Sequence, residues 1–180
     1  SVEQTEKSNN SQLAREIELA LPVELSREEQ TRLVREYCSS QFVSKGMCAD
    51  FNIHDTGSGN PHAHILLTMR PLDEKGAWAA KSKKEYVLDE SGEKILLPSG
   101  RYKTRKIDLM DWNRQENADL WRKAWADMAN DFLEQNGSAE RIDHRSNAER
   151  GIDEIPTVHM GVAACQMEKK GIATEKGELN

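Results

Sequence analysis

A stretch of seventeen residues carrying three histidines constrains this chain more than any other part of it. Residues 52–68 have the composition of a strand, a turn and a second strand. The connecting segment 56–61 holds two glycines, an asparagine and a proline, which are residue types that reverse a chain. His62 and His64 are two positions apart, so both side chains point to the same face of an extended strand. The reversal can return His54 to the side of this pair, which predicts that three imidazoles converge from neighbouring strands.

Both predicted strands alternate between polar and apolar positions. In the first strand, the polar face carries Asp50, Asn52 and His54, and the other face is apolar. In the second strand, His62 and His64 oppose Ala63, Ile65, Leu67 and Met69. This alternation is typical of an antiparallel sheet with one face on a core and one face left polar.

Three histidines at this spacing predict a divalent metal site, although a histidine in a strand is more often structural. Imidazole nitrogens suit zinc, manganese, nickel or copper, so the ligands leave the metal open. Three protein ligands leave coordination positions for water or substrate, which is the arrangement of a catalytic site.

A further strand is predicted within residues 12–22. Ile17, Leu19 and Leu21 share its apolar face, whereas Glu16 and Glu18 share the other. If this strand pairs with the histidine strands, both carboxylates lie on the histidine face. Two readings stay open, because the face can equally be a solvated sheet edge and these residue types also favour helix.

The remaining periodic segments predict helices that cover the apolar face of the sheet. Ser26 and Glu29 form a capping box, and the helix that follows carries buried-type residues, including Tyr37, up to Gly46. A long helix over 111–135 has two tryptophans on one stripe, and a short helix is expected over 162–169. We expect a short strand over 141–145 and frayed polar ends over 1–11 and 173–180. The predicted class is α+β, with an antiparallel sheet and helices packed on one face.

Residues 71–110 interrupt this pattern and predict a β-hairpin insertion within a single domain, 1–180. Residues 86–88 and 94–97 are the expected strands, joined by a four- or five-residue turn. The whole chain has a net charge of −6, yet residues 70–106 carry a net charge of +4. A cationic arm with aromatics suits single-stranded nucleic acid, and a solvated surface hairpin is the alternative. The candidate DNA-binding residues here are Arg101, Tyr102, Lys103, Arg105 and Lys106.

Other features bound the class of protein. No apolar run approaches the roughly 20 residues of a membrane span, and no signal peptide is visible. The chain starts at Ser1, which suggests a processed or cut fragment. Its three cysteines form no CxxC motif and suit free thiols in a reducing cytoplasm.

Several motifs together resemble the MobA/MobL family of plasmid and conjugative-element relaxases. The run from His54 through Asn60-Pro61-His62-Ala63-His64, preceded by the strand Arg15–Pro22, carries most of the resemblance. Supporting motifs are Asp143-His144-Arg145-Ser146, Ile155-Pro156-Thr157-Val158-His159-Met160-Gly161 and Met167-Glu168-Lys169-Lys170-Gly171-Ile172. The resemblance covers nearly the whole chain.

This resemblance implies the His-hydrophobe-His (HUH) nuclease fold and a nick in single-stranded DNA at an origin of transfer. His54, His62 and His64 match the metal ligands, for manganese, magnesium, zinc or nickel. Glu18, with Glu16 as the alternative, matches the catalytic acidic residue of the family. The implied setting is a bacterial cytoplasm, with accessory relaxosome and coupling proteins as partners and no membrane.

The chain departs from the family at the nucleophile, a tyrosine on a helix near the N-terminus. Residues 1–11 contain no tyrosine, so we expect that this segment and one strand of the sheet are absent. An exposed sheet edge could then drive dimerisation. Arg145 is expected on the DNA-facing rim, whereas His144 and His159 are not assigned as ligands.

Two other functions compete with a relaxase. A metal hydrolase would use the three histidines to activate water, with Glu18 as a base, and would form no covalent protein–DNA adduct. A non-catalytic DNA-binding module would use the histidines only for packing and would take up no stoichiometric metal.

Overall fold

The computed structural model describes residues 1–6, 8–57 and 59–180, and it divides the chain into two compact units. The first unit spans residues 1–143 and contains the sheet, its helices and the arm. The second spans residues 144–180. Each unit is described by itself.

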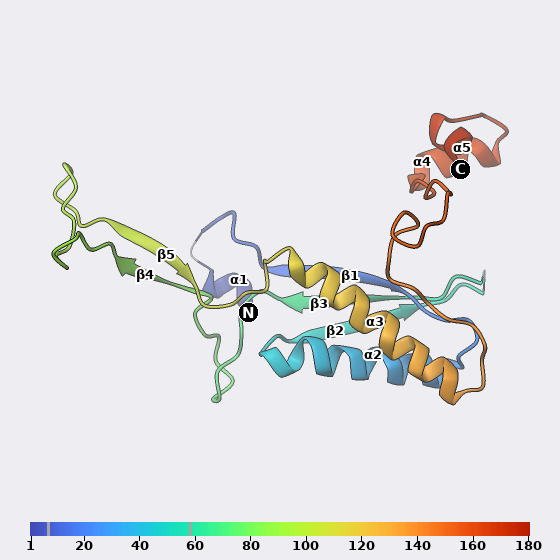
Figure 1. Ribbon diagram of the computed structural model, residues 1–180, viewed down its shortest axis with the longest axis horizontal. Helices are drawn as coiled ribbons and strands as arrows, with labels where there is room; N and C mark the ends of the chain where they lie inside the picture. The colour runs from blue at the N-terminus through green and yellow to red at the C-terminus, as the bar shows by residue number, and fades with distance from the viewer. Residues whose placement is uncertain (7, 58) are drawn as a thin grey trace. The chain divides into compact units, whose positions relative to one another are not determined.

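A three-stranded antiparallel sheet forms the centre of the first unit (Figure 1). Its strands are β1 (Ala14–Ala20), β2 (Ala49–His54) and β3 (His62–Thr68), in the order β1-β3-β2. The middle strand β3 therefore pairs along both of its edges. Strands at the predicted positions confirm the antiparallel sheet, and they place the two carboxylate-bearing positions of β1 beside the histidine strand.

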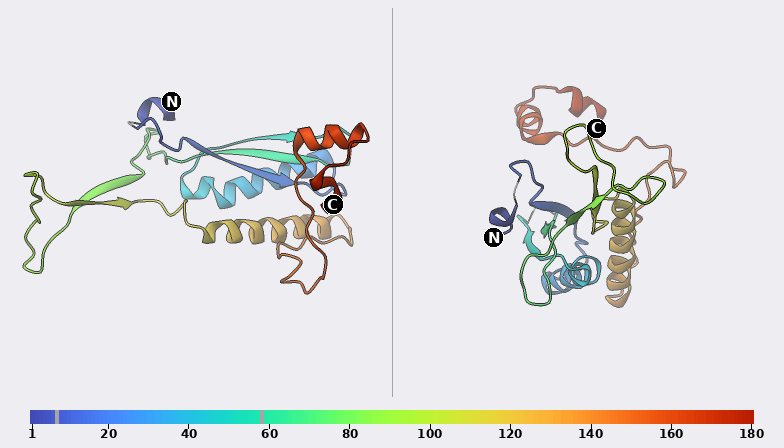
Figure 2. Two further views of the ribbon diagram at one scale, coloured as in Figure 1. Left: turned by 90° about the horizontal axis from the view of Figure 1, so that it is seen from above. Right: turned by 90° about the vertical axis from the view of Figure 1, so that its left-hand side faces the viewer.

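Two helices cover one face of this sheet, as the views in Figures 1 and 2 show. Helix α2 (Arg27–Gln41) begins at the predicted capping box, in which Ser26 and Glu29 bond each other's backbone groups. It ends earlier than predicted, and a short 3-10 turn, η1 (Val43–Lys45), leads to Gly46 with a φ of 93°. Helix α3 (Glu116–Gln135) follows the arm and packs beside α2. The predicted α+β fold with helices on one face is confirmed.

The core lies between this helical layer and the apolar face of the sheet. Ala63, Ile65 and Leu67 of β3 are fully buried, since they point from the middle strand into the helices. Tyr37 of α2 is 1% exposed and meets the ring of Trp125 edge to face at 5.1 Å between centroids. Aromatic packing at the α2–α3 contact therefore holds the helices on the sheet.

The arm between β3 and α3 is a two-stranded ribbon, not the short hairpin predicted at 86–88 and 94–97. Its strands are β4 (Ser82–Tyr86) and β5 (Thr104–Asp108), which pair antiparallel (Figure 1). The predicted turn does form, because the Asp89 side chain accepts hydrogen bonds from the Ser91 and Glu93 backbones. Only one isolated bridge, Leu88–Lys94, remains of the predicted pairing.

The N-terminal segment is anchored, which corrects the expectation that residues 1–11 fray. It contains the one-turn helix α1 (Val2–Thr5), followed by Glu6. The Glu6 carboxylate lies 2.9 Å from Lys81 Nζ and 3.1 Å from an Arg70 guanidinium nitrogen, and its side chain is 6% exposed. Burial alone raises the pKa of Glu6, but hydrogen bonds from Lys81, Ser11 and Arg70 outweigh it and lower the pKa. These bonds tie the N-terminal segment to the root of the arm.

The predicted strand at 141–145 is wrong. The Asn130 side chain donates to the Ile142 carbonyl at 2.9 Å and accepts from the Ile142 N–H at 2.7 Å. Both backbone groups that a ladder would use at this residue are therefore held by helix α3.

The second unit contains two short helices, α4 (Gly161–Lys169) and α5 (Glu175–Leu179). The second helix corrects the expectation that residues 173–180 fray. Its N-cap is Thr174, whose hydroxyl accepts from the Gly177 N–H at 3.1 Å and donates to the Glu168 carboxylate. A cap and a side chain from the preceding helix thus order a polar segment.

No helix within the described residues is both long enough and apolar enough to cross a membrane. All three cysteines are free thiols. Burial raises the pKa of Cys38 to about 11, which makes this thiol an inert core residue.

Replacing Tyr37 by phenylalanine tests the α2–α3 contact. The Tyr37 hydroxyl donates to the Trp121 carbonyl at 2.9 Å inside the core, so its removal is expected to lower the free energy of unfolding by about 1 kcal/mol. The measurement is urea unfolding followed by circular dichroism, with Tyr86→Phe on the exposed arm as the control. Equal stability of both variants would mean that the buried bond contributes nothing.

Candidate functional site

Three imidazoles converge on the sheet face opposite the helices. His54 on β2 lies directly across from His62 on β3, and His64 lies across from Asn52. The ring centroids are 4.7 to 5.5 Å apart, and one nitrogen of each ring lies within 4.8 Å of the others. The predicted convergence is therefore present, and the rings form the one His, Cys, Asp or Glu group of metal-binding size found among the described residues.

The turn between β2 and β3 makes this convergence possible. Gly57 and Gly59 both have positive φ values, 73° and 80°, which a side chain would strain. The Asp55 carboxylate accepts from the Gly57 N–H at 2.9 Å and tightens the start of the turn. Ser58 lies outside the described residues. The chain returns so that the last residue of β2 pairs with the first residue of β3.

Two of the imidazoles are each oriented by a hydrogen bond at Nδ1. His62 Nδ1 lies 2.9 Å from the Asn60 carbonyl oxygen, and His64 Nδ1 lies 2.8 Å from Glu16 Oε1. The Asn60 carbonyl oxygen and a carboxylate oxygen of Glu16 are acceptors, so a neutral imidazole donates to each of them from Nδ1 and presents Nε2 on the other side of its ring. Outer partners of this kind orient metal-binding histidines in general.

Glu16 and Glu18 differ in what they touch. Glu18 is directly opposite His64 in the register, and Glu16 is opposite Leu66. The side chain of Glu16 nevertheless reaches diagonally to His64, a contact that cross-strand geometry allows for long side chains. No hydrogen bond or ion pair of Glu18 occurs among the described residues. The structure thus brings Glu16, the alternative in the sequence analysis, into contact with the histidine cluster.

The donor set fits a divalent transition metal. It consists of three nitrogen donors on two adjacent strands, half-buried at His62 and His64 and exposed at His54. Nitrogens bound to one ion at typical distances of about 2.0–2.1 Å lie at most about 4.2 Å apart, which is close to the 4.8 Å within which the three ring nitrogens lie. Because one side of the cluster is open, a bound ion would keep positions for a further ligand.

The candidate DNA-binding residues of the arm differ in how far they are neutralised. Lys106 pairs with Asp108 at 2.6 Å, and Arg105 shares Glu85 with Lys83. Within the described part of the chain, the side chains of Arg101 and Lys103 have no hydrogen bond or ion pair. Tyr102 is half exposed at the tip. Arg101 and Lys103 are therefore available to an anionic partner.

Arg145, His144 and His159 lie in the second unit, so the structure does not relate them to the histidine cluster. Arg145 has an interaction partner within the chain. The backbone carbonyl of His159 accepts from Lys176 at 3.1 Å.

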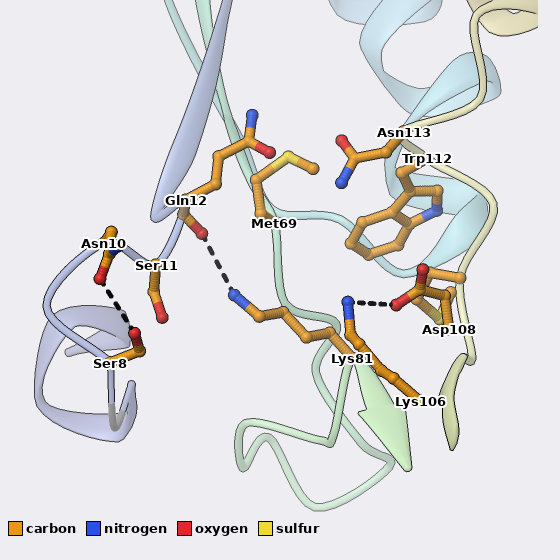
Figure 3. A pocket seen from close by; sticks show the side chains of 11 residues that line it. Ser8, Asn10, Ser11, Gln12, Met69, Lys81, Lys106, Asp108, Trp112 and Asn113 are labelled. Carbon is orange, nitrogen blue, oxygen red and sulfur yellow. Dashed lines mark hydrogen bonds and ion pairs between the residues drawn. The ribbon is translucent and has the colours of Figure 1, made fainter. Parts of the chain in front are cut away.

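A cavity of about 450 Å³ opens at the root of the arm (Figure 3). Trp112 and Met69 provide apolar walls, and the amides of Asn10, Gln12 and Asn113 lie around it. The Lys81 side chain also lines the cavity, and its ammonium group donates a hydrogen bond to the Gln12 carbonyl at 3.3 Å. The cavity marks where the anchored N-terminal segment meets the arm.

Sequence reasoning missed two residues of the arm that cluster with Tyr102. Lys94 Nζ lies 4.1 Å from the Tyr86 ring centroid and 5.6 Å from that of Tyr102. The three residues are spaced eight positions apart, at 86, 94 and 102. An eight-residue repeat, Glu-x-Val/Ile-Leu-x-x-Ser-Gly, is visible at 85–92 and 93–100 and could have revealed this grouping.

Comparison with known proteins agrees with the geometry of the site. Residues 1–170 match the model of the MobA/MobL family. The chain is 38% identical to conjugal transfer protein TraA of Agrobacterium fabrum, over 94% of this chain and 15% of the relative. It is 34% identical to a probable mobilization protein MobA of Bifidobacterium longum, over 99% of this chain and 34% of the relative. The chain thus spans about a third or less of the length of these two relatives.

A solved structure also resembles this chain. It comes from work on the molecular basis of vancomycin resistance transfer in Staphylococcus aureus. Its TM-score is 0.62 and its sequence identity 32%, over 81% of this chain and 63% of that one. The family match, the relatives and the shared fold lead to one conclusion: this chain belongs to the MobA/MobL family of conjugal transfer and mobilisation proteins.

Proposed function

We propose that this chain is the metal-binding, DNA-nicking domain of a relaxase, acting on single-stranded DNA at an origin of transfer. The observation that carries the proposal is the cluster of His54, His62 and His64 on the uncovered sheet face. Membership of a family that contains conjugal transfer and mobilisation proteins supports the choice of substrate.

In this proposal, the Nε2 atoms of His62 and His64 and one nitrogen of His54 hold a divalent cation, with manganese, magnesium, zinc or nickel as candidates. The cation would supply positive charge next to the scissile phosphate. Glu16 acts as a positioning residue, because its carboxylate holds the His64 ring in the tautomer that presents Nε2. Glu18 remains a candidate for proton transfer on the same face.

The proposed reaction is a transesterification by a tyrosine. The phenol oxygen bonds to phosphorus, the bond to the 3′ oxygen breaks, and a 3′-hydroxyl is released after taking up a proton. The phenol proton passes to a base on the histidine face. Tyr37 is buried in the core, and Tyr86 and Tyr102 lie at the tip of the arm. We therefore propose that the nucleophile comes from outside these 180 residues.

The arm is proposed to hold the DNA strand. Its unneutralised cations, Arg101 and Lys103, suit phosphates, and Arg105, Lys106 and the Tyr102 ring extend the same surface. Arg145 is proposed as an additional phosphate contact. Action in a bacterial cytoplasm with accessory relaxosome and coupling proteins belongs to this proposal, as does dimerisation through a sheet edge.

Removing one histidine tests the metal site. His62→Ala is expected to abolish manganese binding measured by isothermal titration calorimetry, because two imidazoles hold the cation too weakly. Glu16→Ala is expected to weaken binding by about 10–100-fold, the range typical when an outer-sphere partner is removed. His159→Ala is the matched control, and circular dichroism checks folding. Stoichiometric manganese in folded His62→Ala would refute the assignment of this histidine.

Incubation with single-stranded origin oligonucleotides and manganese separates a relaxase from a hydrolase. We expect the 180-residue chain to give neither a cleaved strand nor a covalent adduct in denaturing gels, because no tyrosine of this chain lies at the histidines. Cleavage without an adduct would indicate water activation and a hydrolase. An adduct would show that Tyr37, Tyr86 or Tyr102 is the nucleophile.

Neutralising the arm tests its role in DNA binding. Replacing Arg101, Lys103, Arg105 and Lys106 by glutamine is expected to weaken oligonucleotide binding and to reduce the salt slope of log Kd by about 0.7 for each phosphate that the arm no longer neutralises. Fluorescence anisotropy over a series of salt concentrations measures both. The control replaces four exposed cations elsewhere, Arg35, Arg122, Lys123 and Lys170. An unchanged slope in the arm variant would remove the arm from the interface.

A further inference from the structure

The arm contains three consecutive eight-residue segments that pair with one another. The segments are 85–92, 93–100 and 101–108, and the first two share the Glu-x-Val/Ile-Leu-x-x-Ser-Gly pattern. The fourth residue of each segment pairs with the second residue of another. The three pairs are Leu88 with Lys94, Leu96 with Tyr102, and Thr104 with Tyr86. The pairing therefore closes on itself.

The third residues of the segments close the same ring through their backbones. Val87 N–H donates to the Lys103 carbonyl at 2.9 Å, and Lys103 N–H donates to the Ile95 carbonyl at 2.8 Å. Ile95 N–H completes the cycle by donating to the Val87 carbonyl at 3.1 Å. This three-way junction fixes the second residues of the segments, which are Tyr86, Lys94 and Tyr102, next to one another.

These three side chains form a cluster at the surface of the tip. The rings of Tyr86 and Tyr102 meet edge to face at 5.8 Å between centroids, and each is about half exposed. The Lys94 ammonium lies over the Tyr86 ring at 4.1 Å and makes no ion pair within the described residues. A pair of exposed aromatic faces with a cation resting on them is a surface suited to a flat aromatic ligand with a negative charge beside it.

We propose that the Tyr86–Lys94–Tyr102 cluster is a nucleobase-binding platform for single-stranded DNA; this rests on the proposed function for the choice of nucleic acid. A base stacks on a tyrosine ring, and the Lys94 ammonium moves from that ring to the adjacent phosphate. The exchange is favourable, because an exposed lysine interacts with a ring more weakly than a stacked base does.

The charges around the platform favour this ligand. The side chains of Lys84, Arg101 and Lys103, also in the arm, have no hydrogen bond or ion pair among the described residues, so they remain available to the phosphates of a strand bound along the arm. Duplex DNA hides its base faces in the stack, so it offers only phosphates. An anionic bilayer is disfavoured, since the neighbouring loop carries Asp89, Glu90 and Glu93.

Leucine and phenylalanine variants test the platform. Tyr86→Leu/Tyr102→Leu keeps apolar bulk but removes the aromatic faces, and is expected to weaken binding of a fluorescent oligo(dT) 12-mer about tenfold or more. Tyr86→Phe/Tyr102→Phe keeps the faces and is expected to bind like the original chain. Leu72→Ala/Leu109→Ala changes exposed apolar residues of the arm outside the junction and serves as the matched control. Lys94→Gln is expected to reduce the salt slope by about 0.7, for one phosphate.

An abasic 12-mer separates stacking from charge. The leucine and original chains are expected to bind it equally, because it has phosphates but no bases. The proposal would be overturned if the leucine variant and the original chain bound oligo(dT) with equal affinity. It would also be overturned if the leucine variant lost as much affinity for the abasic strand as for oligo(dT). If the leucine variant instead lost binding only to phosphatidylglycerol vesicles and kept its affinity for oligo(dT), the platform would be a membrane-binding surface and the proposal would be overturned.

Failure here is distinguishable from failure of the relaxase proposal. Manganese uptake by Tyr86→Leu/Tyr102→Leu reports on the histidine cluster separately from oligo(dT) binding, because among the described residues the rings of these tyrosines contact each other and none of the three histidines. Loss of the platform with an intact manganese site would leave the relaxase proposal standing. A working platform on a chain that takes up no metal would refute the nicking activity alone.

Discussion

The pairing of β3 along both edges is the constraint on which the rest of the structure depends. Its side chains alternate strictly, so Ala63, Ile65 and Leu67 enter the core while His62 and His64 point to the open face. A shift of one residue would exchange the two sets, exposing the core and burying imidazoles. The helical layer therefore holds the histidines in place, because its packing fixes the register from the other side of the sheet.

The histidine cluster has the geometry that the proposed metal site requires, with three ring nitrogens close together on a face that the helices do not cover. Glu18 and Asn52 lie opposite His64 on the two neighbouring strands, and the Nδ1 atoms of His62 and His64 are held by a backbone carbonyl and by Glu16. The same bonds favour the tautomer of a neutral imidazole in which Nε2 is free to bind an ion.

Charge is divided between the parts of the first unit in a way that matches an anionic ligand. Residues 70–106 carry a net charge of +4 in a chain whose net charge is −6. The root of the arm is held by the nearly buried carboxylate of Glu6 between Arg70 and Lys81. An isolated two-stranded ribbon is marginal in water. The closed three-way junction gives this ribbon a tip with fully paired backbone at its centre, so that side chains such as Tyr86 and Tyr102 can remain exposed without loss of order.

The sequence by itself determined the histidine strands, the first long helix and the convergence of the three rings, because the signals for these features are local. They are the period-two alternation, the turn residues around Gly57 and Gly59, and the Ser26–Glu29 capping box. The sequence could not decide between Glu16 and Glu18, because both lie on the same face of β1. Only the pairing of β1 with β3 determines which of the two side chains reaches His64. Long-range contacts decided the structure of three segments for which local composition gave the wrong prediction or none. The Asn130 side chain bonds both backbone groups of Ile142, so this residue cannot pair in a strand. The ion pairs of Glu6 hold a polar N-terminal segment that would otherwise fray. The junction of three eight-residue segments brings residues that are distant in the sequence of the arm together on one surface.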